Sequence, residues 1–209
     1  MQRKPILKDD FHCRSSQLGI SQQLPNISWS VLTRDDGVGF VVYPLINQSN
    51  FGLNNEYVDQ MNDTVQFFLT ELMSSYADGT YFSFFAQVKR YDERYLSILY
   101  EGEVWTPAKA IGQAFALNLD MESGTLLSLK DFVCITDVTE GLIDGSVREY
   151  SAKGRERFEI PPHIAFGNSR VLDFDINHTH DFFLDDDCVY IIISKSPPSG
   201  WYSIFVVEL

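Results

Sequence analysis

The chain has 209 residues, of which 44% are hydrophobic and 14% aromatic, so it can bury the core of one large domain or of two small, closely packed ones. Its 29 acidic and 16 basic residues give a formal net charge of −13. This charge repels nucleic acids and anionic membrane surfaces, and it attracts a basic protein or a cationic ligand. No stretch approaches the roughly 18 apolar residues of a membrane-spanning helix, so we expect no membrane insertion by this segment.

The beginning of the chain predicts a lead-in followed by two strands. Residues 1–26 are polar and aperiodic, and we expect a flexible lead-in there. The stretch ISWSVLT (Ile27–Thr33) alternates apolar and polar residues, an Asp-Gly turn follows, and GFVVYPLI (Gly39–Ile46) forms the second strand. Pro44 has no backbone N–H, so its late position in this strand predicts a sheet edge or the end of strand pairing.

Residues 54–76 predict a long helix. Apolar residues recur there at steps of three and four, so one face of the helix is apolar. Asn54 or Asn55 can cap its start, and Asp78-Gly79 closes it. The apolar positions are Val58, Met61, Val65, Phe68, Leu69, Leu72 and Tyr76.

Three further strands follow the helix. Residues 80–91 and 94–104 flank Asp92-Glu93 and predict a hairpin, and residues 112–121 form the third strand. Strand alternation places the third strand's apolar residues on one face and its small or polar residues on the other. The first set is Phe115, Leu117 and Leu119, and the second is Ala116, Asn118 and Asp120.

The stretch NLDMESGTLLSLKDF (Asn118–Phe132) predicts a strand end, a tight turn, a short return strand and a helix start. Gly124 supplies the turn, and Ser128 followed three residues later by Asp131 is typical of a helix cap. Apolar spacing after it predicts a second, shorter helical region over residues 128–153. Closing strands are predicted at residues 182–184, 188–194 and 201–209.

The order of elements predicts an α+β fold with antiparallel sheets packed against one long and one shorter helix. We expect residues 27–111 to form a first α+β module. Residues 112–209 would form a second α+β module, packed closely on the first. The three cysteines, Cys13, Cys134 and Cys188, leave open one disulfide with one thiol or three thiols.

The titratable residues predict no catalytic centre, no cofactor and no metal site. His178 and His180 share one side of a predicted strand, but the aspartates at 185–187 beside them are typical of a solvated turn, and no third ligand is fixed. Cys13 follows His12 directly, but adjacent residues in an extended chain point apart, and no other Ser or Cys has a base predicted to activate it. Carboxylates two or three residues apart, which in a glycosidase flank the scissile bond, are more typical here of a solvated face; they are Glu101 with Glu103, Asp173 with Asp175, and Glu156 with Glu159.

The loop EGEVWTPAKAI (residues 101–111) is the candidate ligand-binding site. A tryptophan beside a proline, placed between charged residues and two strands, is a plausible contact point if it is exposed; the alternative is that the indole folds back over the sheet as core. The site residues that we predict are Glu101, Glu103, Trp105 and Lys109.

Three stretches of the chain resemble a bacterial family of extracytoplasmic two-module domains of unknown function. The stretches are VVYPLINQSNFGLNNEYVDQMND (residues 41–63), FALNLDMESGTLLSLKDFV (residues 115–133) and FFLDDDCVYIII (residues 182–193). Such domains occur in Gram-positive bacteria, in lipoproteins, at the N-terminal side of peptidoglycan deacetylases, and in the outer part of a lysozyme-sensing anti-sigma factor. The loops at residues 103–111 and 194–200 depart from the family pattern.

The resemblance implies a non-enzymatic binding or sensor domain. It would be extracellular or exposed at the cell envelope, with its signal or anchor outside the sequence given. Its expected partner is a basic protein such as a lysozyme, or a peptidoglycan fragment. Two alternatives stay open: an envelope glycan hydrolase or deacetylase that uses surface carboxylates or His178 and His180, and a structural module that positions a neighbouring domain.

Overall fold

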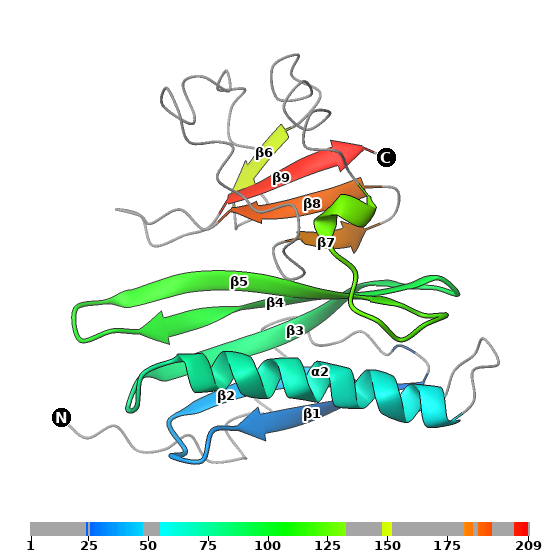
Figure 1. Ribbon diagram of the computed structural model, residues 1–209. Coiled ribbons are helices and arrows are strands. Elements are labelled where there is room, and N and C mark those ends of the chain that lie inside the picture. The colour runs from blue at the N-terminus through cyan, green and yellow to red at the C-terminus, as the bar shows by residue number, and fades with distance from the viewer. Residues whose placement is uncertain are drawn as a thin grey trace.

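The computed structural model describes residues 24, 26–47, 55–132, 148–151, 182–185, 188–193 and 203–208 (Figure 1). In this part of the chain, a five-stranded sheet has the strand order β1-β2-β3-β4-β5, and a four-stranded sheet has the order β6-β9-β8-β7. One long helix, α2, packs on the five-stranded sheet. The predicted α+β class is confirmed. The predicted lead-in at residues 1–26 lies almost wholly outside the described residues.

The first two strands form the predicted hairpin. β1 (Ile27–Thr33) and β2 (Gly39–Ile46) are antiparallel, and Gly37 takes a positive φ of 68° in the turn between them. Pro44 pairs with Trp29 of β1, but the pairing of β2 with β3 ends at Val42, two residues before the proline. The prediction that pairing ends near Pro44 is therefore confirmed on one side of the strand.

α2 (Asn55–Ser75) connects β2 to β3 (Tyr81–Tyr91), and these two strands are parallel. A helix between two strands carries the chain back along the sheet, so the second strand starts at the same end as the first. The prediction of antiparallel sheets holds for the other six described strand pairs and misses this one.

β4 (Tyr95–Trp105) and β5 (Ala110–Asp120) complete the five-stranded sheet as antiparallel neighbours. The β3–β4 hairpin turns at residues 92–94, as predicted, and the register between the two strands shifts between Val88 and Arg90. β5 is paired with β4 along its whole length, so the boundary that we predicted between residues 111 and 112 falls inside this sheet.

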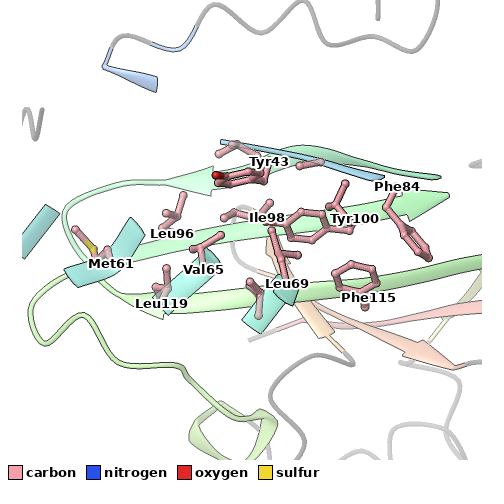
Figure 2. Packing of buried hydrophobic residues seen from close by; sticks show 14 of the residues in the cluster. Tyr43, Met61, Val65, Leu69, Phe84, Leu96, Ile98, Tyr100, Phe115 and Leu119 are labelled. Atoms are coloured by element: carbon pink, nitrogen blue, oxygen red, sulfur yellow. The ribbon is translucent and has the colours of Figure 1, made fainter. Parts of the chain in front are cut away.

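The main core lies between α2 and the five-stranded sheet (Figure 2). Met61, Val65 and Leu69 of the helix are at most 2% exposed and pack against alternate residues of the strands. Since burying one such side chain stabilises a fold by about 1.5–3 kcal/mol, this face fixes the helix on the sheet. The strand residues that contribute include Tyr43, Phe84, Leu96, Ile98, Tyr100, Phe115, Leu117 and Leu119.

The turn after β5 follows the prediction, and of the predicted second helical region only the start and the end are described. Gly124 has a φ of 68°, and Leu126 forms a single antiparallel bridge with Leu119 as the short return strand. Ser128 then begins only a one-turn 3-10 helix, η1 (Leu129–Asp131), in which Asp131 Oδ2 accepts from the backbone N–H and the hydroxyl of Ser128, both at 2.8 Å. Residues 133–147 lie outside the described residues.

The end of the predicted second helix is wrong, because residues 148–151 form strand β6 (Arg148–Ser151). β6 pairs with β9 (Ser203–Glu208), and β9 pairs with β8 (Cys188–Ile193). β7 (Phe182–Asp185) pairs with β8 at the edge of this sheet. The three closing strands β7, β8 and β9 lie where the sequence predicts strands.

The second sheet packs on the face of the first sheet that points away from α2. Phe183 and Ile192 contact Leu99, Ala114 and Ala116 there, and all five residues are at most 8% exposed. The molecule therefore has three layers: α2, the five-stranded sheet and the four-stranded sheet, as Figure 1 shows. Each face of β4 and β5 belongs to a different core.

Candidate functional site

Three of the four predicted site residues share one face of β4. Leu96, Ile98 and Tyr100 face α2, so Glu101, Glu103 and Trp105 face the opposite side, where the second sheet packs. The site is thus on the outer part of the β4–β5 hairpin and not beside the helix.

Cover by the second sheet decreases along this face toward the hairpin tip. Leu99 is 2% exposed beneath Phe183, and Glu101 is half-buried at the rim, opposite Ala114. Glu103 is exposed, and Trp105 is half-buried at the end of the strand. On this face the Glu103 carboxylate is therefore open to solvent, whereas the Glu101 carboxylate is partly covered.

Glu101 is held in a small polar cluster from two strands. Gln87 of β3 donates through Nε2 to Glu101 Oε2 at 2.9 Å. Burial raises the pKa of the Glu101 carboxyl above its ordinary value, and the nearby Lys89 ammonium and the Gln87 hydrogen bond partly offset that rise. The Lys89 Nζ lies 5.5 Å from the centre of the Phe183 ring, so this cation touches the second sheet as well.

Trp105 packs against an aromatic ring on the neighbouring strand. Tyr81 and Trp105 are directly paired between β3 and β4, and their rings meet edge to face with centroids 6.4 Å apart. The sequence left open whether Trp105 is an exposed contact or part of the core. In the structure Trp105 is partly exposed, so its solvent exposure lies between these two alternatives. Its indole therefore keeps part of its surface for solvent.

Lys109 belongs to the hairpin turn and not to the strand face. The backbone N–H of Thr106 donates to the Lys109 carbonyl at 2.9 Å, and the Lys109 N–H donates to Thr106 Oγ1 at 3.1 Å. Lys109 is exposed, and it precedes Ala110, which pairs with Trp105. The structure thus brings the four predicted residues to one end of one hairpin.

The sequence analysis missed the contribution of β3 to this site. Tyr81 and Gln87 come from a strand whose residues alternate between the two faces, and that alternation was visible in the sequence. What the sequence did not show is the register of the hairpin, which pairs Tyr81 with Trp105 and includes an irregularity between Val88 and Arg90.

A second surface with an unusual composition lies on the outer side of α2. Phe67 is 70% exposed, although it is a large apolar residue. It lines a shallow groove together with polar residues of the same helix, and three of these residues carry carboxylates. These residues are Glu56, Asp59, Gln60, Asp63 and Thr64.

Of the residues of the enzymatic alternative, the pair Glu101 and Glu103 lies in the described part of the chain, where the two share one face of β4. His178, His180, Glu156, Glu159, Asp173 and Asp175 all lie outside the described part. Among the described residues, no group of three or more His, Cys, Asp and Glu side chains is arranged to hold a metal ion. Nor does any described helix combine the length and the apolar character needed to cross a membrane.

Comparisons with known proteins give structural neighbours of unknown function. No protein-family model matches the chain, and no curated protein matches its sequence. A DUF3298 family member from Bacteroides fragilis is similar over 87% of this chain and 89% of its own, with 15% identity and a TM-score of 0.48. A DUF3298 family protein from Pseudomonas aeruginosa is similar over 91% of this chain and 93% of its own, with 12% identity and a TM-score of 0.44. The links to anti-sigma factors and deacetylases stay predictions.

Proposed function

We propose that this chain is a non-enzymatic binding or sensor domain exposed at the cell envelope, and that its ligand is a basic protein. A net charge of −13 supports this choice, because it steers cationic partners toward the domain and polyanions away from it.

The observation that carries the proposal is the shared face of Glu101, Glu103 and Trp105. A carboxylate and an indole are the groups that bind an arginine or lysine side chain, the first by a charge-assisted hydrogen bond and the second by a cation–π contact. Lys89 already lies near Glu101 and over the Phe183 ring, so this face accommodates a cation within the domain itself.

A cell-envelope glycan, such as a peptidoglycan fragment, is the second candidate. The Tyr81–Trp105 pair offers aromatic surface beside the Gln87 amide and the Glu101 carboxylate, and sugars need both ring contacts and hydrogen-bonding groups. The enzymatic alternative, with surface carboxylates or His178 and His180, requires cleavage or deacetylation of that same glycan, which product analysis would detect.

Calorimetry with lysozyme as the basic probe, and separately with muropeptides, tests these candidates. We expect lysozyme to bind, with an affinity that falls as salt rises, and Glu103→Gln and Trp105→Ala to weaken the binding. Glu93→Gln, an exposed carboxylate in the other hairpin, is the charge-matched control. Muropeptide binding alone would favour the second candidate, and the absence of binding to either probe would refute the proposed function.

A further inference from the structure

We propose that the outer face of α2 is a docking surface for a basic protein, with Phe67 as its apolar anchor. This inference rests on the proposed function, since it takes the partner to be cationic. It adds a surface on the opposite side of the five-stranded sheet from Glu101, Glu103 and Trp105.

Phe67 points away from the core because of its position in the helix. Val65 and Leu69, two residues before and two after it, are at most 2% exposed against the sheet. A helix advances about 100° per residue, so a residue two positions from each of them lies on the opposite side. Phe67 is therefore at the centre of the solvent-facing side, and its 70% exposure agrees with that.

The fold gives no reason for a phenylalanine at this position. The ring covers no part of the main core, and phenylalanine is only a moderate helix former. Large aromatic residues at the centre of an exposed patch are typical anchors of protein interfaces, where a partner's pocket removes them from water.

The charged residues around Phe67 indicate the charge of the partner that would bind there. α2 has 21 residues and carries four acidic side chains, Glu56, Asp59, Asp63 and Glu71, but no Lys, Arg or His. Asp59 and Asp63 are four residues apart, so they repel each other along the helix. No ion pair among the described residues involves an α2 carboxylate.

A cationic partner would relieve this repulsion. The partner that fits is a protein surface with lysine or arginine side chains around an apolar pocket. The pocket would bind the Phe67 ring, and the basic side chains would pair with the α2 carboxylates. A nucleic acid or an anionic membrane carries the same negative charge as this surface and would be repelled.

Binding of lysozyme to the full chain, measured by surface plasmon resonance, tests the surface. We expect Phe67→Ser to weaken binding about tenfold or more, mainly through faster dissociation. The double variant Asp59→Asn, Asp63→Asn should slow association and flatten the dependence of affinity on salt. Lysozyme acetylated on its lysines should bind the parent chain more weakly than unmodified lysozyme.

Matched controls come from other exposed positions. Val31→Ser removes apolar surface that is 44% exposed on β1, and the double variant Glu93→Gln, Glu122→Gln removes two exposed charges from turns. Neither control should change lysozyme binding. The melting temperature of each α2 variant should match that of the parent, because the changed side chains lie outside the core.

The outcomes separate this inference from the proposed function. If lysozyme binds and only Glu103→Gln and Trp105→Ala weaken it, the function stands and the α2 surface is refuted. If the α2 variants weaken binding and the controls do not, the surface is supported. If lysozyme does not bind the parent chain at any salt concentration, the α2 surface is overturned, and the proposed function is then decided by the muropeptide measurement.

Discussion

Ser97 and Asn118, which face each other on β4 and β5, hold the edge strand of the second sheet. The Ser97 hydroxyl donates to Asn118 Oδ1 at 2.7 Å, Asn118 Nδ2 donates to the Phe182 carbonyl at 2.6 Å, and the Leu184 N–H donates to Ser97 Oγ at 2.8 Å. Both side chains are 0% exposed. Two side chains thus take the place of a neighbouring strand beside β7.

Asn118→Ala should destabilise the protein by about 2–4 kcal/mol, because it leaves the buried Phe182 carbonyl without its donor and opens a small cavity. Ser97→Ala should cost about 1–3 kcal/mol, because the Leu184 N–H loses its acceptor. Urea unfolding of the two variants and of the double variant measures this. Since the residues form one network, the double variant should lose less than the sum; additive losses would show that they act independently.

Tyr100→Phe should stabilise the protein by about 1 kcal/mol, because the buried Tyr100 hydroxyl has no hydrogen-bond partner among the described residues. Its ring stacks on Phe115 with centroids 4.7 Å apart, and phenylalanine keeps that contact. Tyr76→Phe is the matched control. The Tyr76 hydroxyl hydrogen-bonds Gln113 Oε1 at 2.8 Å, so its removal should cost about 0.5–1.5 kcal/mol. Destabilisation by both variants would mean that Tyr100 has a partner.

Arg34 and Asp36 make stability depend on pH in the acid range. The hydrogen bond from the Arg34 guanidinium, followed by that from the Val38 N–H, lowers the pKa of Asp36 to about 2. The folded state therefore favours the ionised carboxylate. This contribution is present above the ordinary pKa near 4 and is lost as the pH falls through about 2.

Asp36→Asn should accordingly flatten the loss of stability between pH 4 and pH 2. Urea unfolding of the parent and the variant across this range measures the change. Asp35→Asn, at an exposed neighbouring position, is the control and should keep the parent's pH profile. An NMR titration of Asp36 that gave an ordinary midpoint would contradict the prediction.

Glu101 should show the opposite sign. Burial raises its pKa, so the folded state favours the protonated carboxyl; this stability is present at low pH and is lost as the pH rises through the raised pKa. Glu101→Gln should therefore become more stable relative to the parent between pH 4 and pH 7. Lys89→Met should raise the pKa of Glu101 further, because it removes the cation that lowers it. A Glu101 midpoint at or below the ordinary value, by NMR, would refute this account.

The sequence predicted the elements of the first sheet because each has a strong local pattern. Strand alternation at residues 112–121 assigned Phe115 and Asn118 to opposite faces, and the structure confirms this. The parallel pairing of β2 with β3 was missed, since local pattern does not give the direction in which two strands meet. The strand at residues 148–151 was missed because apolar residues spaced three and four apart just before it favoured a helix.

The candidate site was predictable only in part. The sequence placed Glu101, Glu103, Trp105 and Lys109 together only because they lie in one predicted loop; in the structure β4 extends to Trp105, so the first three share a strand face. Gln87 comes from the neighbouring strand, and its hydrogen bond to Glu101 depends on the hairpin register. Phe67 was missed for a different reason: the search was for the repeating apolar positions of the helix, and Phe67 lies outside that repeat.

Both faces of β5 are packed in a core, and this links the behaviour of the two sheets. Phe115, Leu117 and Leu119 belong to the core beneath α2, whereas Ala114 and Ala116 belong to the contact with Phe183 and Ile192. Melting of either sheet would strip one side of the same strand and weaken the other. We therefore expect both sheets to unfold in a single cooperative transition, with coincident near-ultraviolet and far-ultraviolet circular dichroism curves. A chain truncated after β5 would retain all five strands of the first sheet, but it would expose to solvent the apolar side chains of that sheet that β7 covers.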